Sequence, residues 1–290
     1  SNFDLLLNKN FKLIDYKLDS EINYDKLYIN LKKLHLNNFI TDFNNEIILA
    51  KGSLHLNLNK KEKTKIKLNS DYIFNEKQKP RNISLYYEKL NLTEQFQLSL
   101  DLIENEININ QINFKKKRNE DFQLNLILNK NKNSYEIENF QLFNDKNKFS
   151  INNLNFDKKL KIINFNLIEA NFYNNKNFLN NILFERRNGK INIISNQLDI
   201  SLNLEKILRS SEDFEILKYF KSLNTLINID IKLAKLDDDH NLINIIGEAE
   251  ITNNKIDKAN ISANFEQKGN FIYTKNEIEG KKVTTIFSDL

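Results

Sequence analysis

The sequence predicts an all-β protein whose strands form an antiparallel sheet, accompanied by one or two short helices. The first observation is an apolar residue at every second position, as at Phe96, Leu98, Leu100 and Leu102. Because successive side chains of a strand point to opposite faces of the sheet, this spacing gives each strand one apolar and one polar face. The second observation is that clusters of Asn, Asp, Lys and Gly separate the alternating runs, as expected for turns.

Alternating runs follow one another from Phe3 to about Leu167, which predicts a succession of short strands in this part of the chain. Further examples are the runs at 54–58 and 122–128. The expected turns lie at 51–52, 59–63, 75–80, 115–119, 129–133 and 144–147. The only proline, Pro80, falls in one of these turns, where its missing N–H interrupts no hydrogen-bonded ladder.

Two segments change to helical spacing. Phe178, Leu179, Ile182 and Leu183 predict a short helix before the Asn188–Gly189 turn signal. A second helix is predicted near 205–223, after the alternating run at 198–204. Its N-terminal cap would be Ser210 or Ser211, and its apolar face would consist of Phe214, Leu217, Phe220 and Leu223.

Alternation resumes at Thr225 and continues to the last residues. The expected strands are 227–233, 242–251, 256–265, 271–275 and 283–287, with turns at 237–241, 253–254, 269–270 and 279–280. This order predicts a meander of antiparallel strands.

Composition excludes several functional classes. The chain has no Cys, so disulfides, thiolate metal sites and cysteine nucleophiles are absent. The 43 basic and 39 acidic residues are interspersed, which is unlike the basic footprint of a nucleic-acid-binding protein. No window approaches the length of apolar residues that a membrane span needs.

The sequence contains no motif that carries catalysis, a cofactor or a metal ion. The three histidines, His35, His55 and His240, are far apart and have no metal-ligand spacing. The spacing of acidic residues in 237–248 resembles a calcium loop, but Leu242 replaces the required Gly, which favours a hairpin turn. The basic run at 115–118 is interpreted as an exposed turn tip between strands. We therefore expect a non-enzymatic protein with no catalytic residues, no cofactor and no metal.

The remaining question is what covers so long an apolar face. The sheet could close on itself as a sandwich or barrel, wind into a solenoid with a side-chain-filled core, or curl into a trough filled by hydrocarbon. Bulky Leu, Ile and Phe suit all three solutions, so periodicity alone does not select one of them.

The segment from about 190 to 290 resembles the C-terminal region of the AsmA-like superfamily, particularly its YhdP and TamB type members. The resemblance is carried by the strands at 198–202 and 227–231 on either side of the helical segment 204–223. It continues through 242–249, 256–265 and 284–290. Residues 1–172 fit as a strand-rich groove body, and 173–290 as an AsmA-like C-terminal-type region whose end is expected to be truncated.

This resemblance implies an elongated, curved antiparallel sheet that forms an apolar groove. It further implies a periplasmic protein that is attached to the inner membrane through a segment outside this chain and conducts phospholipid acyl chains between the inner and outer membranes. The groove-facing residues are expected mid-strand on the apolar register, at Leu98, Leu100, Leu124, Leu126, Phe165, Leu202, Ile229 and Ile261. The alternative is a structural or adhesive β-sandwich or solenoid of the cell surface, with a side-chain-filled core.

Overall fold

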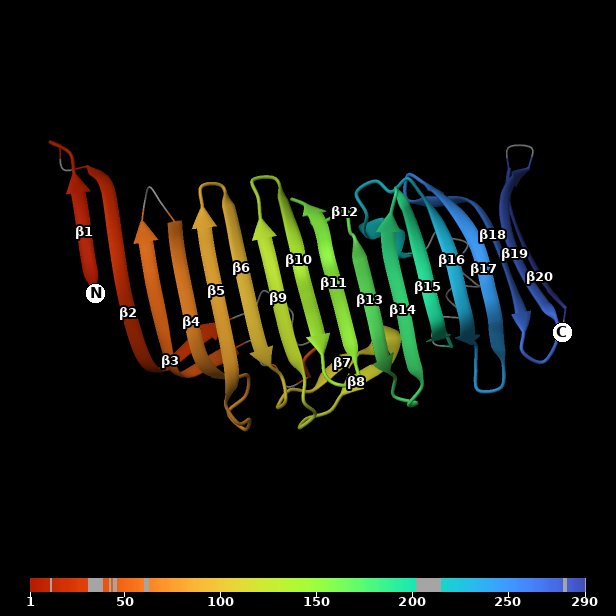
Figure 1. Cartoon of the computed structure of the whole chain (residues 1–290), viewed down its shortest axis with the longest axis horizontal. Helices are drawn as coiled ribbons and strands as arrows, with labels where there is room; N and C mark the ends of the chain where they lie inside the picture. The colour runs from red at the N-terminus through yellow and green to blue at the C-terminus, as the bar shows by residue number, and fades with distance from the viewer. Residues whose placement is uncertain are drawn as a thin grey trace. The chain divides into compact units, whose positions relative to one another are not determined.

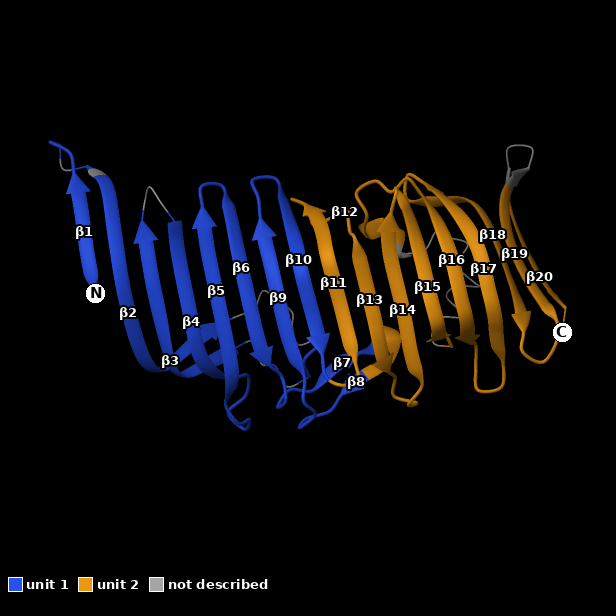
Figure 2. Cartoon of the chain, in the orientation of Figure 1, with its two compact units in different colours: residues 1–110, 115–144 blue, residues 111–114, 145–290 orange. Residues whose placement is uncertain are grey.

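The computed structural model describes residues 1–10, 12–30, 39–41, 43, 46–59, 63–201, 215–278 and 281–289. The fold is all-β, and eighteen strands belong to one large, mostly antiparallel sheet that is not closed (Figure 1). The predicted fold class is therefore confirmed. The chain divides into two compact units, unit 1 (1–110 and 115–144) and unit 2 (111–114 and 145–290), shown in Figure 2. The resemblance to the AsmA-like superfamily predicted a domain boundary between residues 172 and 173, and this boundary stays a prediction.

Unit 1 is a series of antiparallel strands in which each strand pairs with the next along the chain. They are β1 (Asn2–Leu7), β2 (Leu13–Asn30), β3 (Glu46–Asn59), β4 (Lys63–Ile73), β5 (Arg81–Leu90), β6 (Thr93–Asp101), β9 (Gln123–Lys130) and β10 (Ser134–Phe143). Between β6 and β9, the chain forms the strand β7 (Ile107–Ile109), a short 3-10 helix, η3 (Asn110–Ile112), and the strand β8 (Phe114–Lys116). β7 and β8 form a separate two-stranded sheet.

Unit 2 also consists mainly of strands that pair side by side. They are β11 (Lys148–Asp157), β12 (Ile162–Asn164), β13 (Leu167–Tyr173), β14 (Leu179–Arg187), β15 (Lys190–Asp199), β16 (Thr225–Lys235), β17 (Asn241–Thr252), β18 (Lys255–Phe265), β19 (Asn270–Ile278) and β20 (Lys281–Asp289). Two of the expected turns have the positive φ angles of a tight hairpin, with φ of 53° and 76° at Asn188 and Gly189, and 50° and 65° at Asn253 and Asn254.

One strand pair departs from the predicted antiparallel sheet. β15 and β16 run parallel, with Ile193 opposite Ile229. A parallel pair cannot be joined by a tight hairpin, so the chain must cross back between Asp199 and Thr225. This requirement explains why alternation is interrupted in the sequence between these strands.

The predicted helix at Phe178–Leu183 is wrong, because Leu179–Arg187 forms the strand β14. β14 pairs antiparallel with β13 on one side and with β15 on the other. Two hydrogen-bonded ladders outweigh the local apolar spacing, since a helix of one or two turns is marginal by itself.

The second predicted helix lies partly outside the described residues, which exclude 202–214. Within the described part, Glu215–Tyr219 forms a short 3-10 helix, η4. Phe220 then makes an isolated bridge to Ile162, so the predicted helical spacing does not continue to Leu223. Leu217 and Leu223, which were expected on one apolar face, are both buried.

Candidate functional site

The strongest candidate surface in unit 1 is one face of the sheet, on which apolar side chains form rows across the strands. The register of consecutive strand pairs defines three rows, and together they are called the unit 1 apolar face. The rows are Leu56, Ile66, Tyr87, Phe96, Leu128 and Ile137; Leu54, Leu68, Leu85, Leu98, Leu126 and Phe140; and Ile83, Leu100, Leu124 and Leu142. Side chains at directly opposed positions contact one another, so each row is a continuous apolar strip.

One end of the unit 1 apolar face is closed by side chains. Phe43, Leu49, Leu68, Tyr72, Phe74 and Ile83 form a buried cluster, against which Leu98 and Leu100 pack. The Phe43 and Phe74 rings meet edge to face, with centroids 5.1 Å apart. The Tyr72 hydroxyl lies 2.6 Å from the Asp101 carbonyl oxygen and 2.9 Å from Asn105 Oδ1, which ties this cluster to the segment after β6.

A buried lysine completes this closed end. The Lys116 side chain is fully buried, and its Nζ donates hydrogen bonds to the carbonyl oxygens of Ile103 (3.3 Å), Asn105 (2.7 Å) and Lys117 (2.8 Å). Burial lowers the pKa of Lys116 to about 8. The interpretation of 115–118 as an exposed turn tip is therefore wrong for Lys116. The available signal was its position two residues after Phe114 in β8, which places both side chains on the same buried face.

Away from this closed end, the apolar rows are less completely covered. Leu56, Tyr87, Phe96, Leu126 and Leu128 are only half-buried. Among the described residues, the sole additional sheet is the pair of three-residue strands β7 and β8. No second large sheet therefore packs on the unit 1 apolar face within the part of the chain that the structure describes.

Unit 2 also carries an apolar row across its strands, from β13 to β20. The unit 2 apolar row consists of Ile168, Phe184, Ile193, Ile229, Gly247, Ile261, Tyr273 and Ile286. Ile229 and Ile261 pack beside the buried cluster of Ala234, Leu242, Ile245 and Ala263. A side chain at Gly247 would put its Cβ 2.7 Å from the Asn260 carbonyl oxygen and 2.8 Å from Ile261 Cγ1, so this close strand approach requires glycine.

The segment containing η4 closes one end of the unit 2 sheet. Leu217 and Leu223 are buried, and the Phe220 ring lies 6.4 Å from the ring of Phe165. Asn254, in the β17–β18 turn, holds this segment: its Oδ1 accepts a hydrogen bond from Leu223 N (2.5 Å), and its Nδ2 donates one to Phe220 O (3.0 Å). A third bond runs from Asn254 N to Leu223 O (3.1 Å).

No family model, curated protein or solved structure matches this chain. Among the residues that the structure describes, no helix has the length and apolar character needed to cross a bilayer.

The structure brings some of the predicted groove residues together. Leu98, Leu100, Leu124 and Leu126 lie side by side in two adjacent rows, because Leu98 opposes Leu126 and Leu100 opposes Leu124. Ile229 and Ile261 share the unit 2 apolar row, with Gly247 between them.

Two predicted groove residues differ from this arrangement. The mid-strand placement of Phe165 is wrong, since Phe165 lies between β12 and β13 and is only 3% exposed, packed with Phe220. Its apolar neighbours Ile162, Ile163 and Leu167 belong to β12 and β13, and Phe165 stands in the short connection between these two strands. Leu202 lies outside the described residues.

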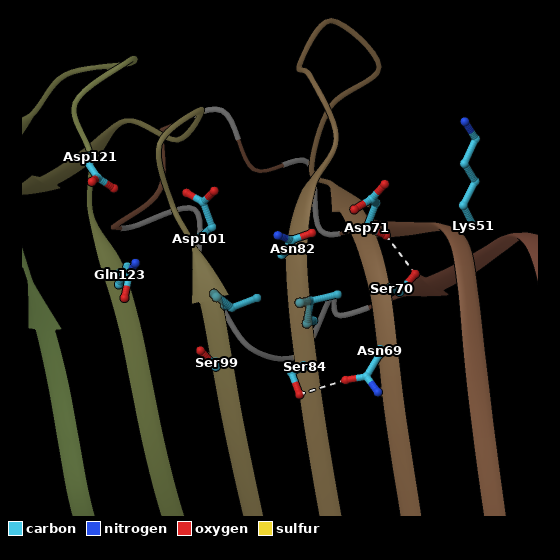
Figure 3. Close-up of a pocket in the computed structure, with 12 residues that line it drawn as sticks. Lys51, Asn69, Ser70, Asp71, Asn82, Ser84, Ser99, Asp101, Asp121 and Gln123 are labelled. Atoms are coloured by element: carbon cyan, nitrogen blue, oxygen red, sulfur yellow. Dashed lines mark hydrogen bonds between the residues drawn. The ribbon is translucent and has the colours of Figure 1, made fainter.

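The opposite face of unit 1 has a shallow polar hollow of about 530 Å³, shown in Figure 3. Its polar lining includes Lys51, Asp71, Asn82, Asp101 and Asp121, and Ser84 donates a 3.1 Å hydrogen bond to Asn69 Oδ1 within it. Within the described ranges, no group of three His, Asp or Glu side chains could hold a metal ion. The same strands therefore carry a polar hollow on one face of the sheet and apolar rows on the other face.

Proposed function

We propose that this chain is a non-enzymatic lipid-conducting or lipid-shielding segment, in which acyl chains lie against the apolar faces of its two units. The observation that supports this proposal is the half-buried state of the unit 1 apolar face, against which no second large sheet packs within the described residues. Rows of Leu, Ile and Phe that share a continuous surface offer an acyl chain contact along its length.

The energetics of such binding need no covalent chemistry. Each methylene that leaves water for an apolar surface contributes about 0.8 kcal/mol. A long acyl chain that contacts several strands therefore gains several kcal/mol, while Leu98 and Leu126 lose their remaining contact with water.

The resemblance to the AsmA-like superfamily adds a cellular context to the proposal. In that context the chain belongs to a periplasmic protein that is anchored in the inner membrane by a segment outside this sequence. It moves phospholipid between the inner and outer membranes and thereby serves outer-membrane biogenesis in the cell envelope.

The test compares two neighbouring substitutions in β9. Leu126→Asp places a charge in the middle of the unit 1 apolar face, where burying it beside an acyl chain is costly. Asn125→Asp introduces the same carboxylate on the polar face and keeps the oxygen that accepts a 2.9 Å hydrogen bond from Ser99. We expect the lipid that crosslinks to unit 1 to fall at least about tenfold in the first variant and to stay unchanged in the second, and the total lipid that co-purifies with the chain to fall only in the first. Equal lipid retention by both variants would contradict the proposal.

The second candidate is a structural or adhesive β-domain of the cell surface. The closed ends favour it, because the cluster around Tyr72 and Phe74 in unit 1 is filled by side chains. A mass spectrum of lipids extracted from the purified chain distinguishes the two functions, since a fully filled core retains no stoichiometric lipid.

A further inference from the structure

The apolar rows of unit 1 end at a row of polar and charged residues on the same face of the sheet. This row, called the unit 1 polar row, consists of Thr64, Lys89, Glu94, Lys130 and Tyr135, which oppose one another across neighbouring strands. Each of them stands two positions along its strand from a member of the first apolar row, as Lys89 does from Tyr87. Because residues two apart in a strand point to the same face, the polar row directly adjoins the apolar rows.

The unit 1 polar row carries a surplus of positive charge. Lys130 Nζ lies 3.0 Å from Glu94 Oε1, and this hydrogen bond lowers the pKa of Glu94, so its carboxylate is ionised at neutral pH. Lys89 flanks Glu94 on the other side and is exposed. Among the described residues, the ammonium group of Lys89 takes part in no hydrogen bond or ion pair. Two lysines therefore stand beside one carboxylate, which leaves positive charge for an anionic partner.

Two tyrosines mark the boundary between the apolar and the charged residues. Tyr87 belongs to the first apolar row and Tyr135 to the polar row, and both are half-buried. The pKa of Tyr87 is raised, first by burial and then by the charge of the nearby Glu94 carboxylate. Tyrosine combines an apolar ring with a polar hydroxyl, so it is enriched where hydrocarbon meets water. This boundary therefore has the side chains expected where lipid tails meet lipid headgroups.

The other end of the same strands is closed. Ile83 is only 7% exposed within the buried cluster that contains Tyr72 and Phe74. Figure 1 shows the β5–β6 turn, beside the polar row, at one end of these strands and β7 near the other. From Lys89 to Ile83 the strand rises by about 20 Å. An acyl chain in one leaflet spans about 15 Å, half of the hydrocarbon core of a bilayer. A chain that starts at the polar row therefore fits on the apolar rows.

We propose that the unit 1 polar row binds the phosphate of a phospholipid whose acyl chains lie along β5, β6 and β9 toward the closed end. This inference rests on the proposed lipid function and adds the headgroup class and the orientation of the lipid. Lys89 and Lys130 donate the charge-assisted hydrogen bonds that a phosphate accepts, and the Tyr135 hydroxyl lies opposite Lys130. A diacylglycerol has the same acyl chains without the phosphate, so the row discriminates against it.

The first test removes positive charge from the polar row. The double variant Lys89→Gln with Lys130→Gln is compared with Lys65→Gln with Lys67→Gln, which removes the same charge from the polar face of β4. Each chain is incubated with vesicles that contain phosphatidylglycerol and diacylglycerol in known proportion, both with the same photoreactive acyl chain. Mass spectrometry then counts the crosslinks of each lipid to peptides of unit 1.

Unit 1 of the parent chain and of the control variant should prefer phosphatidylglycerol. The preference should fall roughly fivefold in the Lys89→Gln, Lys130→Gln variant, because two exposed charge pairs with the phosphate are lost. Crosslinking of diacylglycerol should stay unchanged there, since the apolar rows are intact. Inorganic phosphate should displace the phospholipid no better than chloride at the same ionic strength, because it makes no contact with the apolar rows.

The second test measures the orientation of the lipid. The chain contains no Cys, so Thr64→Cys places a single fluorescent label in the polar row, opposite Lys89. A phospholipid with a nitroxide on its headgroup should quench this label more strongly than one with a nitroxide at the end of its acyl chain.

The outcomes separate this site from the function on which it rests. Loss of the phospholipid preference in the Lys89→Gln, Lys130→Gln variant alone, together with stronger quenching by the headgroup nitroxide, supports the site. Equal preference in this variant and the parent chain, displacement by inorganic phosphate, or stronger quenching by the acyl-end nitroxide would overturn it and leave lipid binding to the apolar rows in place. A parent chain that crosslinks neither lipid would contradict the proposed function itself, and the site with it.

Discussion

At the scale of single residues, Lys116 makes stability depend on pH. Its pKa in the folded chain is about 8, below the ordinary value of 10.5, because burial outweighs the attraction of carboxylates such as Glu120 and Asp101. Between these two values the unfolded chain binds more protons than the folded chain. The free energy of unfolding should therefore rise as the pH increases from about 8 to about 10.

Urea unfolding at about pH 7.5 and about pH 9.5 measures this rise. Lys116→Met keeps an unbranched side chain but removes the titrating group, so its unfolding free energy should change less between the two pH values. The nearby Tyr72 acts weakly in the opposite direction, because burial raises the pKa of its hydroxyl and only the unfolded chain begins to ionise there near the upper pH; comparison with Lys116→Met cancels this contribution. An unchanged pH dependence in the variant would show that Lys116 does not titrate there.

At the scale of elements, Asn254 links the β17–β18 hairpin to the segment that closes unit 2. Its side chain bonds to Leu223 N and Phe220 O. Asn254→Ala should lower the free energy of unfolding by about 1–3 kcal/mol, because it leaves two partly buried backbone groups without these partners. Asn253→Ala is the matched control. Asn253 has a similar positive φ (50° against 65°), so the backbone cost is shared and the difference reports the side-chain bonds.

Hydrogen exchange at the amide of Leu223 provides a local measurement of the same change. Exchange at this amide should accelerate in Asn254→Ala and stay close to that of the parent chain in Asn253→Ala. Similar exchange in the two variants would mean that Asn254 is not what holds the segment.

The elements also show how far alternation predicts this fold. Strands such as β6 and β9 were predictable because a half-buried strand leaves its two-residue period in the sequence. β14 was not predictable as a strand from its sequence. It is a strand because it pairs with β13 and β15, whereas its local spacing is also compatible with a helix. The parallel pairing of β15 with β16 is a long-range choice of partner and direction, and the two-residue period of each strand carries no signal for it.

The candidate site was predictable to a similar extent. The two-residue period of the sequence predicted that Leu98 and Leu126 lie on the apolar face. In the structure the register of β6 and β9 places them directly opposite each other. The same reasoning failed for Phe165, because apolar residues in a buried connection resemble those of a strand. The burial of Lys116 was not predicted, because a lysine in a basic run is expected at the surface. Three backbone carbonyl oxygens accept hydrogen bonds from its Nζ and make the buried position possible.

At the scale of the whole molecule, lipid binding should be divided between the two units, since each has its own apolar surface. Leu126 lies on the unit 1 apolar face and Ile229 in the unit 2 apolar row. Leu126→Asp or Ile229→Asp alone should each reduce the lipid retained per chain, and the double variant should reduce it to background. Quantitative mass spectrometry of extracted lipid measures the three values, with Asn125→Asp as the control. If lipid occupied only one unit, one single variant would already equal the double variant, and the other would match the parent chain.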